Sequence, residues 1–222
     1  FIAGKPLAMP WVKDNADAVI CQWYAGEQQG NSLADILLGK VNPSGKLNVS
    51  FPRSTGNTPC FYNHYGTDRE EPFDSPGSPS DPKGHYIFDT PEPLWNFGHG
   101  LSYTQFSIGE PALDRTEATP ADTVTVTVPV ANSGGMAGKE VVQMYVHQPV
   151  SSVSTPKQQL RAFAKVDLKP GEEKTITLRL PVDELALYNP AMERVVEPGE
   201  YQIQIGNSSD SISFVKSFTV KP

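Results

Sequence analysis

The chain has 222 residues, enough for one large domain or two small ones, since domains cluster at roughly 100–150 residues. Its 18 Lys and Arg residues against 25 Asp and Glu residues give a net charge of −7, which argues against a surface that follows nucleic-acid phosphates. No apolar run approaches the roughly 18–20 residues that a membrane-spanning helix needs. We therefore expect no nucleic acid and no membrane as a partner.

The first residues have the pattern of a strand, a helix and a second strand. Phe1–Ala3 is typical of the end of a buried strand, and Gly4-Lys5-Pro6 predicts a turn into a helix with proline near its first position. The apolar run Ala18–Trp23 is typical of a parallel strand that is covered on both faces. This order predicts a βαβ unit.

A second α/β repeat follows. Gly26–Gly30 is a loop, and Asn31 or Ser32 can cap a helix whose apolar residues recur at helical spacing until Gly39. The turn signal Asn42-Pro43-Ser44-Gly45 precedes a strand in which Leu47, Val49 and Phe51 alternate.

Residues 1–53 supply about three strands and two helices, which is too little to cover both faces of a parallel sheet. We therefore expect them to be the C-terminal part of an α/β sandwich domain. The missing strands should come from an upstream segment, and the chain should begin inside a domain.

Residues 54–114 form a long aromatic and proline-rich loop and linker, because the periodicity fails there while Pro, Gly and aromatic residues accumulate. A loop of this length inside a compact protein is usually functional or mobile. Its aromatic residues favour packing on another surface, and whether that surface is the active site stays open.

Residues 115–222 are expected to form one domain, in which apolar and polar positions alternate from Thr123 onward. Turn signals at residues 132–135, 169–171 and 197–199 separate about seven short strands, which predicts an all-β immunoglobulin-like or fibronectin type III-like sandwich. The alternating apolar residues are Val124, Val126, Val128 and Val130, then Val142, Met144 and Val146, then Ile176, Leu178 and Leu180, then Tyr201, Ile203 and Ile205, then Ile212 and Phe214.

The cysteines and histidines suggest no metal site. Cys21 on a predicted strand and Cys60 in a loop have neither a disulfide framework nor metal-ligand spacing, and we expect two free thiols. The four histidines are too scattered to predict a metal cluster, and His99, between two glycines, is expected to have a packing and hydrogen-bonding role. We expect no cofactor.

Several segments, in this order, resemble the C-terminal part of glycoside hydrolase family 3, the family of many β-glucosidases and β-xylosidases. In the first half they are Gly4–Leu7, Ala16–Val19, Trp23–Gly39, Asn42–Leu47, Phe51–Ser54, Tyr62–His64 and Phe97–Phe106. In the second half they are Gly138–Val146, Pro156–Phe163 and Val196–Tyr201. Each motif is weak by itself, but the ordered set is specific and covers nearly the whole chain.

The resemblance implies an enzyme with a barrel domain, an α/β sandwich domain and a fibronectin-like domain. Such an enzyme hydrolyses β-glycosides with retention, using two carboxylates about 5–5.5 Å apart. The resemblance places the nucleophilic Asp and the acid/base Glu upstream of residue 1, so we expect this chain alone to be inactive. It also implies a β-glucoside or oligosaccharide substrate and a periplasmic or secreted location.

Glu27 is a tempting catalytic carboxylate, because it follows a strand and precedes a helix, where α/β ligand sites occur. An acid at a helix N-terminus is, however, also stabilised by the helix dipole. The loop Gly26–Gly30 lacks the Lys-Ser/Thr that a nucleotide P-loop needs. We therefore interpret this loop as structural, with its glycines allowing close packing against the barrel.

If the long loop reaches the mouth of an active site, in its own subunit or in a homodimer, Asp68, Arg69 and Phe73 are the candidate outer-subsite residues. Most of the loop's other aromatic residues are expected to pack in a core or an interface. The alternative function is a non-catalytic β-sandwich module that binds polysaccharide or protein. A free-standing module would have no need of half an α/β domain.

Overall fold

A computed structural model describes residues 1–65, 79–80 and 92–222. The chain forms two compact units. The helical unit comprises Phe1–Val41, Leu47–Tyr62 and Thr67–His99, and the sandwich unit comprises Asn42–Lys46, Asn63–Gly66 and Gly100–Pro222. Within the described ranges, every helix is too short or too polar to cross a membrane.

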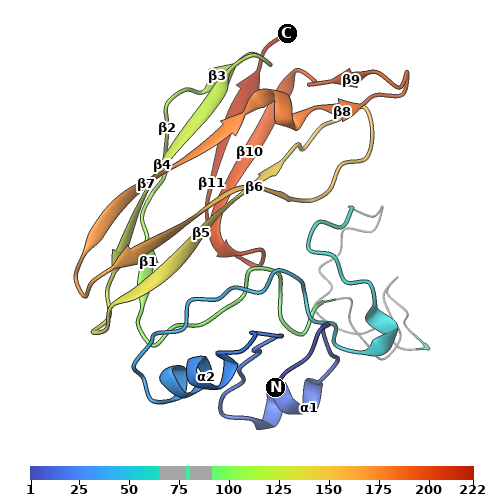
Figure 1. Ribbon diagram of the computed structural model, residues 1–222. Helices are drawn as coiled ribbons and strands as arrows, with labels where there is room; N and C mark the ends of the chain where they lie inside the picture. The colour runs from blue at the N-terminus through green and yellow to red at the C-terminus, as the bar shows by residue number, and fades with distance from the viewer. Residues whose placement is uncertain (66–78, 81–91) are drawn as a thin grey trace. The chain divides into compact units, whose positions relative to one another are not determined.

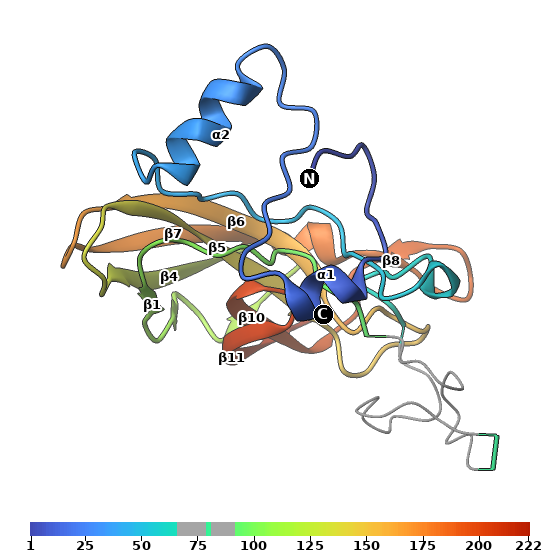
Figure 2. The same cartoon turned by 90° about the horizontal axis from the view of Figure 1, so that it is seen from below.

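Among its described residues, the helical unit has two short α-helices, which lie apart from each other in Figure 2, and one 3-10 turn. Helix α1 spans Pro10–Asn15, α2 spans Gln29–Leu37, and η1 spans Thr55–Asn57. The first helix starts later than predicted, because Pro10 and not Pro6 occupies its first turn.

The predicted cap of α2 is wrong. Gln28 is the N-cap residue, and Asn31 and Ser32 lie inside the helix, where their side chains bond back to Gln28. The predicted end is close, because Gly39 adopts a φ of 68° two residues after Leu37. Such a left-handed conformation suits glycine and stops the helix.

The predicted parallel pairing of residues 1–3 with residues 18–23 is present as a single rung. The Phe1 amino group donates to the Ile20 carbonyl at 2.8 Å, and Gln22 N–H donates to the Phe1 carbonyl at 3.1 Å. This alternation of donor and acceptor is that of parallel strands. Neither segment is assigned as a strand, because a parallel strand needs neighbours along a longer ladder.

The predicted strand Leu47–Phe51 pairs with residues 94–99 instead of with a parallel neighbour. Leu47 N–H donates to the His99 carbonyl at 2.8 Å, and Phe51 and Trp95 form an antiparallel bridge. We call these two segments, 47–51 and 94–99, the ribbon. The predicted turn at Asn42–Gly45 is wrong, because these residues run without a turn.

The sandwich unit holds eleven strands in three sheets (Figure 1). One sheet has the order β1-β4-β2 with β7 paired to β4, the second has the order β3-β11-β10-β5-β6, and β8 pairs with β9. The strands are β1 Phe106–Ile108, β2 Ala112–Leu113, β3 Glu117–Ala118, β4 Thr123–Asn132, β5 Gly138–His147, β6 Gln159–Leu168, β7 Glu173–Pro181, β8 Leu187–Tyr188, β9 Arg194–Val195, β10 Gly199–Ser208 and β11 Ser211–Val220, with a 3-10 turn η2 at Val182–Leu185.

The core of this unit comes from the inward positions of the long strands. Val128 on β4 and Ile203 on β10 are completely buried, and Met144 on β5 joins the same cluster. The strict alternation of β4 produces this burial, because successive side chains of a strand point to opposite faces. The predicted core of β4, β5 and β10 is therefore confirmed.

Two strands differ from the alternation that the sequence suggests. Strand β6 lies at the edge of the five-stranded sheet, and its buried and exposed residues do not alternate regularly along its first half. Its sequence therefore lacks the alternation that predicts a strand. On β11 the deepest residues are Phe218 and Val220, whereas Ile212 and Phe214 are partly buried. An edge position and a strand end both weaken the link between pattern and burial.

Candidate functional site

The three predicted outer-subsite residues, Asp68, Arg69 and Phe73, lie outside the described residues. Their assignment therefore stays a prediction. The sites that the structure does describe are a glycine-bounded loop, an aromatic cluster in the helical unit, and a buried polar network in the sandwich unit.

Glu27 lies exposed in the loop before α2. Gly26, with a φ of 78°, turns the chain so that its carbonyl accepts a hydrogen bond from Gln29 N–H at 3.2 Å. A tight, exposed polar turn at the start of a helix is explained by its role in starting that helix. These contacts support the structural interpretation of the loop.

The aromatic cluster is the centre of the helical unit. Phe51 is buried, with the rings of Phe1, Trp23 and Trp95 around it at centroid distances of 6.0, 5.8 and 5.7 Å. Edge-on and tilted rings at these distances are the usual geometry of aromatic packing. Trp95 therefore packs, as expected for most aromatic residues of the long loop, whereas Phe61 of the same loop is 65% exposed.

Both cysteines and His99 lie among the described residues. Cys21 and Cys60 are free thiols, and burial raises the pKa of Cys60. Among the described residues, no group of three or more His, Cys, Asp and Glu side chains could hold a metal ion. His99 accepts a hydrogen bond from Leu47 through its backbone carbonyl, which fits the predicted hydrogen-bonding role.

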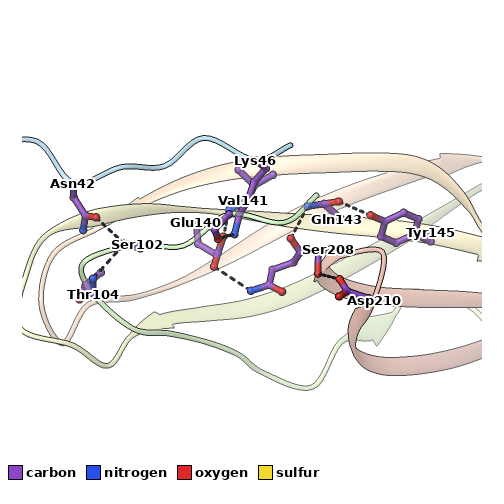
Figure 3. Close-up of polar contacts among 12 residues, drawn as sticks. Asn42, Lys46, Ser102, Thr104, Glu140, Val141, Gln143, Tyr145, Ser208 and Asp210 are labelled. Carbon is purple, nitrogen blue, oxygen red and sulfur yellow. Dashed lines mark hydrogen bonds and ion pairs between the residues drawn. The ribbon is translucent and has the colours of Figure 1, made fainter. Parts of the chain in front are cut away.

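A buried ion pair joins Lys46 to β5. Lys46 Nζ lies 2.9 Å from Glu140 Oε1 and donates to the Gly100 carbonyl at 2.8 Å (Figure 3). The side chains are 13% and 8% exposed, respectively. Ions this shielded from water need close partners, because desolvation of each one costs several kcal/mol.

The ion pair is one end of a longer polar network along β5 and β10. Glu140 Oε1 also accepts a bond from Val141 N–H, and Glu140 Oε2 accepts one from Asn207 at 3.4 Å. The Asn207 carbonyl accepts a bond from Gln143 Nε2 at 2.6 Å, and Gln143 Oε1 accepts one from the Tyr145 hydroxyl. Connected groups of this kind polarise one another and hold a single arrangement.

Asn42 makes a second connection beside the ion pair. Its Oδ1 accepts hydrogen bonds from Ser102 Oγ at 2.8 Å and from Tyr103 N–H at 2.9 Å (Figure 3). Its Nδ2 donates to the Ala137 carbonyl at 3.0 Å. The sequence-based interpretation assigned Asn42 to a local turn, but its side chain bonds remote segments instead.

A cavity of about 70 Å³ lies in the sandwich unit, lined in part by Gln148, Gln159, Arg161 and Tyr201. Small-molecule sites measure roughly 300–1,000 Å³. This cavity is therefore too small to enclose an oligosaccharide, and it does not support the alternative of a polysaccharide-binding module.

Next to this cavity, Glu197 holds the chain that follows β5. Its carboxylate accepts bonds from Ser152 N–H and Gln148 Nε2, each at 3.1 Å, and from Ser151 Oγ at 2.9 Å. Hydrogen bonds, those from Ser152 foremost, hold the pKa of Glu197 below its usual value. Burial, together with the charge of Glu197, raises the pKa of Tyr201 to about 12.

Two family models match the chain. The model of the glycosyl hydrolase family 3 C-terminal domain matches residues 1–103, and that of a fibronectin type III-like domain matches residues 140–209. Together they follow the order of motifs that the sequence analysis identified.

Similar proteins are longer than this chain. A β-xylosidase of Formosa agariphila is 40% identical over 99% of the chain and 29% of its own length. A periplasmic β-glucosidase of Salmonella typhimurium is 40% identical over 93% of the chain and 26% of its own length. The crystal structure of a Listeria innocua β-glucosidase in complex with glucose matches 100% of the chain and 30% of its own at 36% identity, with a TM-score of 0.91.

The chain thus spans less than a third of the length of these relatives. The comparisons confirm the predicted resemblance and the predicted fold class, an α/β fragment followed by a β-sandwich. We conclude that the chain belongs to glycoside hydrolase family 3, carrying the family's C-terminal domain and a fibronectin type III-like domain.

Proposed function

We propose that the protein to which this chain belongs is a retaining β-glycosidase, and that it acts as a β-glucosidase on terminal β-D-glucosyl residues. The observation that carries this proposal is the likeness to the Listeria innocua β-glucosidase, at 36% identity and a TM-score of 0.91 over the whole chain. A likeness this close over both units supports a shared architecture and, with it, a shared class of reaction.

Under this proposal the chain supports catalysis without performing it. Residues 1–53 are the end of the α/β sandwich domain, residues 54–114 are the loop and linker, and residues 115–222 are the fibronectin-like domain. The catalytic Asp and Glu lie in the part of the enzyme before these residues. Both acid catalysis and capture of the glycosyl group need those carboxylates.

The test is a panel of p-nitrophenyl glycosides assayed with the full-length protein and with the isolated 222 residues. We expect the full-length protein to release p-nitrophenol from the β-glucoside and to form β-glucose first, as followed by NMR. We expect no hydrolysis by the isolated chain. A full-length protein inactive on every β-glycoside would overturn the proposal, and an active isolated chain would overturn the division of roles.

β-Xylosidase activity is the second candidate, because the Formosa agariphila β-xylosidase matches 99% of the chain at 40% identity. The same panel separates the two activities. A kcat/KM for the β-xyloside above that for the β-glucoside would favour the xylosidase.

Asp68, Arg69 and Phe73 remain our candidates for outer-subsite contacts, reached from the same subunit or across a homodimer. Truncating Arg69 or Phe73 to alanine in the full-length enzyme should change its preference between aryl glucosides and disaccharides. Equal kcat/KM ratios before and after truncation would count against this assignment. We also propose a periplasmic or secreted location, which cell fractionation would test, since the Salmonella typhimurium relative is a periplasmic enzyme.

A further inference from the structure

The chain passes from the sandwich unit to the helical unit after Lys46 and belongs to the sandwich unit again from Gly100, with Asn63–Gly66 between them also assigned to the sandwich unit. These two residues are bonded directly, since Lys46 Nζ donates to the Gly100 carbonyl at 2.8 Å. Their backbones are also close, because a Cβ atom added to Gly100 would lie 2.2 Å from the Gly45 carbonyl oxygen. The two ends of the 47–99 segment therefore meet at one point.

Both ends are also held by the sandwich unit. Glu140, at the start of β5, neutralises Lys46 at 2.9 Å, and Asn42 bonds Ser102 and Tyr103 on the returning chain. Asn42 additionally donates to the Ala137 carbonyl, just before β5. We call Asn42, Lys46 and Glu140 the anchor.

The anchor is more rigid than a surface ion pair. The side chains of most exposed pairs remain mobile and are screened by water. Here both side chains are almost completely buried, and the second carboxylate oxygen of Glu140 accepts a bond from Asn207. These contacts hold the carboxylate opposite Lys46.

Beyond the anchor, the leaving and returning segments stay paired as the ribbon. Gly98 N–H donates to the Leu47 carbonyl at 2.7 Å, and Leu94 N–H donates to the Phe51 carbonyl at the same distance. Closing the ends of a long segment costs loop entropy, and contacts at its base offset part of that cost. The anchor therefore favours the pairing of the two segments.

We propose that Asn42, Lys46 and Glu140 are positioning residues of the sandwich unit that hold Lys46 and Gly100, the residues next to Leu47 and His99, in one arrangement in the working glycosidase. The activity part of this inference rests on the proposed function. Catalysis depends on a fixed geometry around the reacting atoms, because small displacements lower the rate steeply.

The first test is hydrogen exchange on the full-length protein with Lys46→Met. We expect exchange of the ribbon amides of Leu47, Phe51, Leu94 and Gly98 to rise at least roughly tenfold, because their local opening becomes easier. Exchange in β4 and β10 should rise by a smaller factor, because Lys46→Met also leaves the Glu140 charge unpaired and lowers the stability of the whole unit. Ribbon exchange equal to wild type, or an equal rise in β4 and β10, would overturn the anchor.

Lys139→Met is the matched control, because it removes an exposed lysine of β5 that is next to Glu140 in the sequence. Lys139 pairs with Asp167 at 3.7 Å, and the two side chains are 52% and 66% exposed. This variant should leave ribbon exchange unchanged. If it raises ribbon exchange as much as Lys46→Met does, the effect is not specific to the anchor and the proposal fails.

The second readout is kcat/KM for p-nitrophenyl β-glucoside. Lys46→Met should lower it roughly tenfold, Lys46→Arg should restore part of the loss, and Lys139→Met should match wild type. No rescue by arginine, together with unchanged ribbon exchange, would contradict the proposal. If wild type hydrolyses no glycoside, the proposed function fails while hydrogen exchange still decides the anchor.

Asn42→Ala covers the case in which Lys46→Met does not fold. This change removes the bonds to Ser102, Tyr103 and Ala137 and leaves no unpaired buried charge. We expect a smaller rise in exchange that is again confined to the ribbon. Wild-type exchange in Asn42→Ala, in the absence of a folded Lys46→Met protein, would overturn the inference.

Discussion

The helical unit and the sandwich unit use their apolar residues in opposite ways. In the sandwich unit, β4 and β10 bury whole rows of apolar side chains in a common core. In the helical unit neither α1 nor α2 buries a residue, and Trp11 and Leu38 are 73% and 69% exposed. An antiparallel sandwich completes its core from one stretch of chain, whereas a parallel α/β sheet needs covering on both faces.

This difference explains why the two units should respond differently to mutation. The sandwich unit has the features of an independently stable domain, namely paired strands and a continuous core. The helical unit has an aromatic centre around Phe51 but leaves much of its apolar surface exposed. The four predictions that follow test this contrast, from the largest expected effect to the smallest.

The largest loss of stability should come from truncating a side chain in the core of the sandwich unit. Ile203→Ala removes a completely buried side chain on β10 and should lower the free energy of unfolding by about 2–5 kcal/mol, through lost burial and a cavity. Leu38→Ala in the isolated chain should change it by less than about 0.5 kcal/mol. Denaturant unfolding of both variants measures this difference. Equal losses of unfolding free energy would contradict the contrast between the two units.

Breaking the buried ion pair should have the next largest effect. Glu140→Gln leaves the Lys46 charge buried without its carboxylate and should cost about 3 kcal/mol of folding free energy. The double variant Lys46→Met with Glu140→Leu should be much closer to wild type, because no charge stays buried. Thermal unfolding of the three proteins tests this, and a double variant as unstable as Glu140→Gln would refute the charge argument.

A steric change at Gly100 should cost somewhat less. Its added Cβ would meet the Gly45 carbonyl oxygen at 2.2 Å, so Gly100→Ala should destabilise the chain by about 1–3 kcal/mol as the backbones separate. Gly135→Ala is the control, because nothing lies within 4 Å of its added Cβ. Similar melting temperatures for the two variants would show that the close approach is dispensable.

The smallest effect should be a pH dependence of the chain around residues 148–152. Because the pKa of Glu197 is lowered in the folded state, its contribution is complete above the unfolded pKa and is lost as pH falls through the folded value. The protection factor of the Ser152 amide, which is the unprotected exchange rate at a given pH divided by the measured rate, should therefore fall as the solution becomes acidic. In Glu197→Gln this protection factor should be lower at neutral pH and less dependent on pH, and a pH profile identical to wild type would contradict the assignment.

Most of the sandwich could be predicted from the sequence. Val124, Val126, Val128 and Val130 stand at every second position of β4. All four are buried, because a strand points successive side chains to opposite faces. Strand β6 could not be predicted in this way, since one of its edges is unpaired and its burial pattern is irregular. The pairing of β3 with β11 is also a property of the assembled sheet.

Less of the candidate site was predictable. The sequence marked Lys46 as part of a family motif and Glu140 as part of another, but it contained no signal that the two side chains meet. Asn42 looked like a turn residue because Asn-Pro-Ser-Gly is a common turn composition. Its actual partners, Ser102 and Ala137, are remote in sequence, and local composition carries no information about them.

The sequence alone determined the class of each unit, because periodicity and turn residues act locally, and it determined the family through an ordered set of motifs. Only the tertiary structure decided that Lys46, Glu140 and Gly100 form one buried contact at the base of residues 47–99. The physical reason is that the free energy of an ion pair depends on the distance between the charges and on their desolvation. Both quantities exist only once remote segments have been brought together.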